Sequence, residues 1–285
     1  MVFDEKKYKS LLYPVIENYD KFCRDNNLRY TIYAGTLLGA VRHGGMIPWD
    51  DDIDVLMPRP DYNKFIELSK EVFIPGFKVV NAYNDHYCYT TFSKVVDCNT
   101  TLVEMASIKN AVIGAYIDVF PLDGVDVDEE EAERHYQEFL KLVKKTRTTR
   151  YEFCFKDLFT RVAGFRSYLQ NKYFRSKYDY NELLKNCDKL ASRTDYEKST
   201  ITRIYCSPNH SKKLFPREWF DEYIDMKFDH LTLRSIKEWD KFLTTLFKDY
   251  MKLPPEEKRI THHSHVYFNP DHGYSYEELV NQGLL

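Results

Sequence analysis

Residues 35–55 read GTLLGAVRHGGMIPWDDDIDV and hold the densest group of chemically useful side chains in the sequence. Asp52 and Asp54 are two residues apart in this stretch, with Ile53 between them. In a β-strand this spacing directs both carboxylates to one face of the sheet and Ile53 to the opposite face, toward the core. Two neighbouring carboxylates repel each other unless a cation lies between them, and hard oxygen ligands on a rigid strand suit Mg²⁺ or Mn²⁺. The stretch therefore predicts a metal-binding strand at residues 52–57.

The beginning of the same stretch predicts a phosphate site. Gly35 and Thr36 follow residues 28–34 (LRYTIYA), which are rich in β-branched and aromatic side chains and predict a strand. They precede the apolar residues 37–41, which predict a short helix. Backbone N–H groups at the beginning of a helix, together with the Thr36 hydroxyl, can hold a phosphate oxygen.

An acidic run is more often a solvated turn than a metal site, so the DDDID segment has a simpler interpretation. Two features favour the metal site. Trp49 and Ile53 bracket the acids with large apolar side chains that anchor the segment, and a third carboxylate, Asp118, occurs later in a similarly apolar setting, YIDVFPLDG. With the Gly-Thr turn added, the functional interpretation is the stronger one.

The flanking segments predict an α+β fold, with a mixed sheet flanked by helices. Apolar residues recur at helical spacing from Leu12 to Cys23, and Pro60 and Asp61 begin a second helix that extends to about Ser69. Further strands are expected at residues 77–81, 87–96, 101–105 and 115–120. Helices arranged around such strands indicate the α+β class.

Composition changes after Gly124, and three regions are expected: a catalytic core at 1–125, a helical basic and aromatic insertion at 126–180, and a helical C-terminal lobe at 181–285. Residues 141–178 carry eleven Lys and Arg side chains against two acids. Their second half, from Phe155 onward, predicts an amphipathic helix packed on its own domain. An interfacial helix on anionic lipid is the sharper alternative. RNA binding is weaker, because no recognition module accompanies the charge.

Bulk properties predict a cytoplasmic globular protein. The net charge of −3 argues against a general nucleic-acid binder, and the six cysteines are scattered without a CxxC pair, as expected of reduced thiols. The N-terminal MVFDEKKYKS lacks the apolar segment of a signal peptide, and no apolar run approaches the ~20 residues needed to span a bilayer.

The motifs together resemble a known family. A Gly-Thr turn, an acidic strand and a later single Asp resemble the nucleotidyltransferase fold, and the string GTLLGAVRHGGMIPWDDDID closely resembles the LicD family, the phosphocholine transferases of bacterial cell-surface glycans. Fukutin and fukutin-related protein, which transfer ribitol phosphate, belong to the same superfamily. The resemblance continues through MPRPDYNKF, FSKVVD and YIDVFPLDG, and it covers about the first 125 residues.

The resemblance implies a set of metal ligands. Asp52 and Asp54 match the paired ligands of the family, and Asp118 matches its third carboxylate. Asp50 falls on another acidic position of the motif and is a further candidate ligand, whereas Asp51 is expected to be the spare acid. The ion implied is Mg²⁺ or Mn²⁺.

The resemblance also implies phosphate contacts. Gly35 and Thr36 would contact the phosphates of the donor, and Arg42 and Lys94 match basic residues suited to pairing with a diphosphate. Arg259 and His262 of the C-terminal lobe are weaker candidates for reaching the same site. Structural zinc at Cys206 with His210, or at His262 with His265, is disfavoured because the turn chemistry of a zinc knuckle is missing.

The activity implied is transfer of phosphocholine from a CDP-linked donor such as CDP-choline to a sugar hydroxyl of a glycan acceptor, with release of CMP. Lipid-linked glycans are among the acceptors implied. Such a transfer belongs to teichoic acid or lipopolysaccharide biosynthesis. The enzyme would then lie in the cytoplasm or peripherally on the inner face of the cell membrane. Transfer of ribitol phosphate, glycerol phosphate or a nucleotide is the rival activity. A catalytically inactive scaffold that keeps the fold is the rival outside enzymes, and the intact acidic set argues against it.

Overall fold

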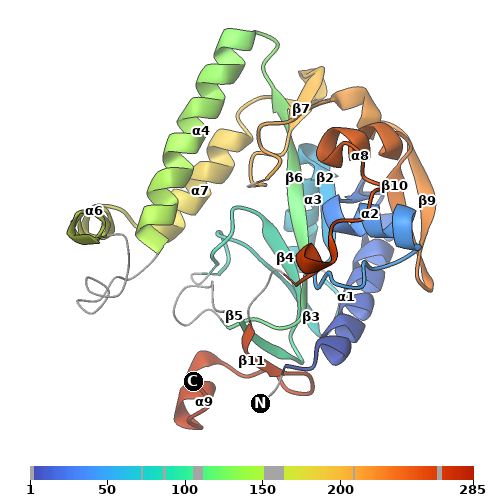
Figure 1. Cartoon of the computed structure of the whole chain (residues 1–285). Coiled ribbons are helices and arrows are strands. Elements are labelled where there is room, and N and C mark those ends of the chain that lie inside the picture. The colour runs from blue at the N-terminus through green and yellow to red at the C-terminus, as the bar shows by residue number, and fades with distance from the viewer. Residues whose placement is uncertain are drawn as a thin grey trace.

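The computed structural model describes residues 3–71, 73–85, 88–104, 112–150, 164–207, 209–261 and 265–285. It confirms the α+β class: helices flank a mixed sheet that runs through the middle of the molecule (Figure 1). Among these residues, no helix is long and apolar enough to cross a bilayer.

The main sheet has the strand order β1-β2-β6-β4-β3, and β7 with β8 extends it from β6. Its strands are β1 (Thr31–Ile32), β2 (Asp54–Pro58), β3 (Phe77–Val80), β4 (Ser93–Asp97), β6 (Tyr116–Val125), β7 (Ile201–Arg203) and β8 (Leu214–Pro216). Only β2 and β6 pair in parallel, and the other neighbours are antiparallel. Two smaller sheets pair β9 (Tyr223–Phe228) with β10 (Leu231–Ile236), and β5 (Thr101–Glu104) with β11 (His265–Asn269).

Strand β6 is the central element, and all ten of its residues are buried. Its first half pairs with β4 as far as Val119, and its last three residues pair with β7 from Asp123 onward. Pro121 lies between these two partners on the chain, at the place where β6 changes its antiparallel neighbour. Proline has no N–H to donate, so it is tolerated in this central strand where the antiparallel ladder is interrupted.

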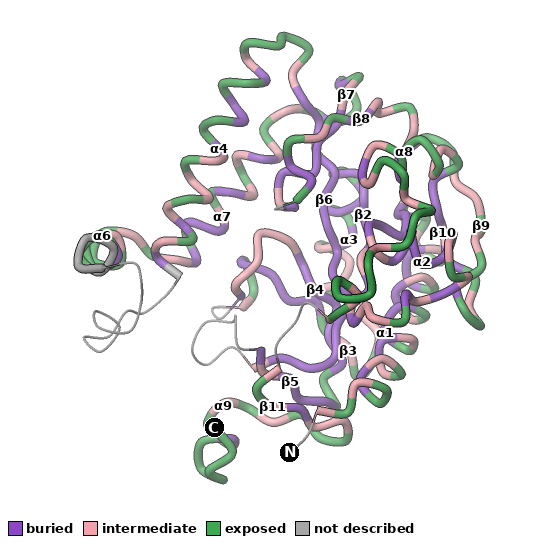
Figure 2. Tube along the Cα trace, viewed as in Figure 1, coloured by how far each residue is buried: buried purple, intermediate pink, exposed green. Residues whose placement is uncertain are grey.

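The helices are α1 (Glu5–Asp25), α2 (Ala34–His43), α3 (Arg59–Glu71), α4 (Glu129–Arg150), α6 (Gly164–Lys177), α7 (Tyr180–Ala191), α8 (Trp239–Phe247) and α9 (Tyr276–Asn281), with short 3-10 helices η1 (Tyr196–Lys198), η2 (Arg217–Phe220) and η3 (Glu256–Lys258). Helix α1 begins at Asp4, whose side chain accepts a hydrogen bond from the backbone N–H of Lys7. Its predicted apolar stripe is buried, and the purple segments of Figure 2 show that burial concentrates in the sheet and on the helix faces turned toward it.

Several boundaries differ from the sequence-based expectation. The strand predicted at residues 28–34 is paired only over Thr31–Ile32, because α2 begins already at Ala34. The strand predicted at 52–57 begins at Asp54, so Asp52 lies in the preceding loop. The strand predicted at 87–96 begins at Ser93.

The sequence had suggested a helical C-terminal region, but the structure shows strands there as well. Residues 181–285 contain β7 to β11 as well as helices. Two of these strands find partners far away in the sequence: β7 pairs with the end of β6, and β11 pairs with β5. Such pairing joins residues far apart in the sequence, so the hydrophobic periodicity within residues 181–285 does not predict it. The division into regions at 1–125, 126–180 and 181–285 stays a prediction.

Candidate active site

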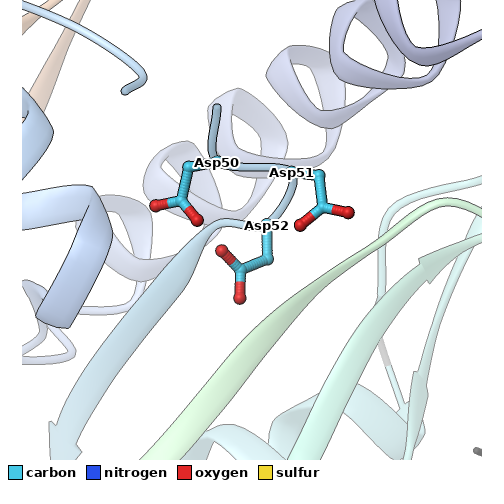
Figure 3. A group of neighbouring side chains, drawn as sticks. All are labelled: Asp50, Asp51 and Asp52. Carbon is cyan, nitrogen blue, oxygen red and sulfur yellow. The ribbon is translucent and has the colours of Figure 1, made fainter. Parts of the chain in front are cut away.

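Three consecutive carboxylates converge in the loop that leads into β2. Figure 3 shows Asp50, Asp51 and Asp52 with oxygens turned toward one another, and one oxygen from each lies within 4.8 Å of the other two. Asp51 is the most buried of the three, with 2% of its surface exposed. The sequence had suggested that Asp51 was the spare acid. In the structure its buried carboxylate is grouped with those of Asp50 and Asp52.

Asp54 and Asp118 lie side by side at the beginning of two parallel strands, because Asp54 on β2 is in register with Asp118 on β6. On the other side of β6, Asp118 is in register with Lys94 of β4, and the Lys94 ammonium lies 2.6 Å from an Asp118 carboxylate oxygen. The same ammonium lies 3.5 Å from the centre of the Tyr116 ring. The sheet therefore gathers two carboxylates and a buried cation at the end of β2 and β6 where the aspartate loop enters.

The two strand carboxylates have unusual proton affinities. Burial raises the pKa of Asp54 well above its ordinary value, and the negative charges of Asp52, Asp118 and Asp50 raise it further. Burial likewise raises the pKa of Asp118 to about 6, although the Lys94 ammonium opposes the shift. Burial is thus the largest cause of both pKa shifts, and the neighbouring carboxylates add to it.

The first turn of α2 borders this acidic group. A Cβ on Gly35 would meet the Asp50 carboxylate, so a larger residue here would have to displace that side chain. Thr36 is buried, and its hydroxyl accepts a hydrogen bond from the backbone N–H of Asp54 at 2.8 Å. Ala34 has a positive φ of 46°, a costly conformation for a residue with a side chain. The predicted Gly-Thr turn is thus the beginning of the helix, and it is tied to β2.

Arg42, the other predicted phosphate contact on α2, lies in the last turn of that helix. Its guanidinium donates hydrogen bonds to the backbone carbonyls of Tyr250 and Lys252, at 2.9 and 3.4 Å. Arg259 lies near enough to lower the pKa of Arg42, after burial as the larger cause. The hydrogen-bond partners of Arg42 thus lie in the segment after α8. The guanidinium carbon of Arg259 lies 5.4 Å from the centre of the Trp49 ring.

Two further residues belong to this site: Glu104, which was not singled out from the sequence, and His265, which entered only through the disfavoured zinc interpretation. Glu104, at the end of β5, accepts hydrogen bonds from the hydroxyls of Tyr89 and Tyr116, and its charge contributes to the raised pKa of Asp118. His265, its register partner on β11, lies with Nε2 3.5 Å from Asp51 and stacks on Phe3. The lone acid at the end of a strand pattern was the only available signal for Glu104, and the spacing of His262 and His265 was the only signal for His265.

The acidic group suits a divalent cation. Oxygen ligands at about 2.1 Å from Mg²⁺ lie at most about 4.2 Å apart, so small side-chain rotations of Asp50, Asp51 and Asp52 would suffice to bring their oxygens together around one ion. A cation would also relieve the repulsion that raises the pKa of Asp54. The predicted set of Asp52, Asp54 and Asp118 shares Asp52 with this compact group.

The histidines of the disfavoured zinc interpretation have other surroundings. His210 is buried, and its Nδ1 lies 2.6 Å from the Tyr33 hydroxyl. Burial, aided by Lys213, lowers the pKa of His210 to about 4. His262 and His263 lie outside the described residues.

Comparison with known proteins identifies the domain that carries this site. A family model described as LicD/FKTN/FKRP, nucleotidyltransferase domain, matches residues 27–159. The lipopolysaccharide cholinephosphotransferase LicD of Haemophilus influenzae is 28% identical over 255 residues, which cover 87% of this chain and 92% of that protein. An uncharacterized protein of Rickettsia typhi is 42% identical over 74 residues, 26% of this chain and 22% of that protein. Mannosyltransferase regulator 4 of Saccharomyces cerevisiae is 33% identical over 119 residues, 42% of this chain and 10% of that protein.

The family match and the acidic site fall on the same stretch of chain, since residues 27–159 include the α2 N-terminus, the aspartate loop, Lys94 and Asp118. The relative from Haemophilus influenzae extends the similarity beyond this domain to most of the chain. The protein carries a LicD/FKTN/FKRP nucleotidyltransferase domain and is a distant homologue of LicD over most of its length.

Proposed function

We propose that this protein is a metal-dependent transferase that moves phosphocholine, or a similar phospho-alcohol, from a CDP-linked donor to a hydroxyl of a cell-surface glycan precursor, and that it releases CMP. The observation that carries the proposal is the concentration of aspartates at the beginning of β2 and β6, where the charges of Asp50, Asp52 and Asp118 all act on Asp54. The cholinephosphotransferase activity in the name of the Haemophilus relative supports the choline headgroup and the lipopolysaccharide acceptor.

The proposed ligands for the ion are Asp52, Asp54 and Asp118, with Asp50 as a further candidate. A bound Mg²⁺ or Mn²⁺ would supply positive charge against the donor diphosphate and the charge that develops during transfer. The backbone N–H groups at the beginning of α2, next to Gly35, are suited to hold donor phosphate oxygens. The Lys94 ammonium adds a positive charge within the same site.

The proposed transfer reaction requires one proton acceptor from the protein. In the proposed reaction the acceptor hydroxyl oxygen bonds to the distal phosphorus, the bond from that phosphorus to the CMP oxygen breaks, and the hydroxyl proton must leave. Asp118 is the proposed base, since the register of β2 and β6 holds its carboxylate beside Asp54 within the same site. CMP then departs with the electrons of the broken bond.

Donor screening tests the proposal. With Mg²⁺ and a saccharide acceptor, we expect CMP release from CDP-choline, with CDP-ribitol and CDP-glycerol as the competing donors. Pyrophosphate release from CTP would instead indicate a nucleotidyltransferase, and the absence of turnover with every donor would favour the inactive scaffold. Asp54→Asn should lower the rate by more than about a hundredfold, since loss of a group supporting a metal site already costs up to that much. Asp249→Asn, at an exposed acid remote from the site in sequence, is the matched control.

We further propose a cytoplasmic enzyme that docks peripherally on anionic lipid through the basic insertion. Helix α6 supports this role, because Leu169 and Tyr173 are exposed on it next to Lys172, Arg175 and Lys177. Its buried Asn171 donates a hydrogen bond to the carbonyl of Thr148, which fixes α6 to α4. Co-sedimentation with liposomes should require anionic lipid and weaken with salt; equal binding to neutral liposomes, or none at all, would contradict the docking role.

A further inference from the structure

A cavity lies between α3, residues 81–83, residues 90–92 and α7. Its volume is about 410 Å³, toward the lower end of the range for small-molecule sites. The lining side chains that carry the argument are Tyr62, Asn63, Asn81, Tyr83, Phe92 and Asp188.

The cavity is close to the reacting groups. Phe92 is one of its lining residues, and the Phe92 ring lies 5.5 Å from the Lys94 ammonium, which contacts Asp118. Phe92 thus links the lining of the cavity to the Lys94–Asp118 pair.

One wall of the cavity is held in place by a network of charges. Asp188 accepts a hydrogen bond from Arg59 at 2.8 Å and another from the Tyr83 hydroxyl at 2.9 Å. Arg59 also contacts the fully buried Asp123, so it links the cavity to β6. The Tyr83 ring is 51% exposed although its hydroxyl is anchored. The Tyr83 ring is thus held in one orientation before a ligand binds, so less side-chain entropy is lost on binding.

The chemistry of the lining favours a neutral polyhydroxylated ligand. Most lining side chains are polar, and amides and hydroxyls both donate and accept hydrogen bonds, as sugar hydroxyls require. An exposed tyrosine ring suits the apolar C–H face of a sugar. A quaternary ammonium group fits less well, because Arg59 already lies 5.1 Å from the Tyr62 ring and Lys94 lies near Phe92. An anion fits less well too, since Lys70 is paired with Glu67.

We propose that this cavity binds a sugar unit of the glycan acceptor, with Tyr83 packing against the sugar ring and Asn63 and Asp188 bonding its hydroxyls. This assignment of an acceptor subsite rests on the proposed transferase function. Tyr83 and Asn63 are then specificity-determining residues that act on the acceptor and not on the donor.

A kinetic experiment separates acceptor from donor. Tyr83→Ala should raise the KM for a soluble oligosaccharide acceptor by about tenfold, equivalent to about 1.4 kcal/mol, with no comparable rise in the KM for CDP-choline. Tyr83→Phe keeps the ring and should recover most of the acceptor affinity. Asn63→Ala, at an exposed position of α3, is a second variant that leaves the fold undisturbed. Leu214→Ala removes a comparably exposed apolar side chain elsewhere and should leave both KM values unchanged.

A binding experiment is independent of turnover, so it separates failure of the subsite from failure of the proposed function. Amide NMR spectra of the full chain would be recorded with glucose, galactose or N-acetylgalactosamine at millimolar concentration, and with choline chloride. At least one sugar should shift the Asn63 and Tyr83 signals, and Tyr83→Ala should weaken that binding. Shifts with choline alone, no shifts with any sugar, or equal binding by Tyr83→Ala would each overturn the subsite, even if CMP release is observed.

Discussion

At the residue scale, Lys94 decides the charge state of the site. Its ammonium is almost fully buried, and a buried charge is tolerated only when it is paired. Asp118 supplies the opposite charge at 2.6 Å, and the face of Tyr116 supplies a second favourable contact. The sequence predicted a phosphate contact for Lys94; the structure adds that this lysine is tied to the proposed base.

Replacing Lys94 should therefore change the proton affinity of Asp118. In the metal-free protein, Lys94→Met removes the charge that holds the pKa of Asp118 down, so this pKa should rise above its value of about 6. Carboxyl-carbon NMR titration would measure it. Lys227→Met, at an exposed position on β9, is the control and should leave the titration unchanged. A constant or lower pKa in Lys94→Met would show that the ion pair is not formed.

At the scale of elements, the two ends of α2 have different surroundings. The first turn lies against the aspartate loop, where Gly35 allows close contact with Asp50. The last turn carries Arg42, which donates to backbone carbonyls of the segment after α8. Helix α2 therefore connects the acidic site to the C-terminal part of the chain, a link that spans more than two hundred residues of sequence.

This connection predicts a structural effect for Arg42→Ala. Loss of charged hydrogen bonds to Tyr250 and Lys252 should lower the free energy of unfolding by about 1–2 kcal/mol. Hydrogen exchange of the backbone around residues 250–252 should become faster. Arg134→Ala removes an exposed ion pair with Glu131 and should cost less than about 1 kcal/mol. A tenfold rise in donor KM without loss of stability would instead support the diphosphate contact.

At the scale of the whole molecule, the fold maintains a strongly acidic site at the expense of stability. The raised pKa values of Asp54 and Asp118 mean that their protonated forms are favoured in the folded state. A group of this kind contributes stability that is fully present below its unfolded pKa and is lost as the pH rises through its folded pKa. Both groups act in the same direction.

The metal-free protein should therefore become less stable as the pH rises from about 4 to above 6. Addition of Mg²⁺ at neutral pH should raise the Tm, because an ion that binds the folded state stabilises it by mass action. Thermal unfolding with EDTA and with MgCl₂, at pH 5 and pH 7.5, measures both effects. In Asp54→Asn the dependence on Mg²⁺ should be smaller. A Tm that is insensitive to Mg²⁺ at both pH values would argue against the metal site.

Local pattern was sufficient for part of this protein. The stripe from Leu12 to Cys23 predicted α1, and the alternation around Ile53 predicted a buried strand beside acidic side chains. It was less reliable at boundaries, since Asp52 lies before β2 and Gly35 lies inside α2. These errors arise because strand pairing and helix initiation depend on partners that a short window of sequence does not contain.

By itself, the sequence determined the helical and strand periods, the acidic composition of the loop before β2, and the resemblance that the family match bears out. Only the tertiary structure decided which of those acids are buried and what surrounds them. Asp51 is enclosed and lies beside His265, more than two hundred residues away, because β11 pairs with β5. The physical reason is that proton affinity and metal affinity depend on distance and burial, and both are set when strands far apart in the sequence come together.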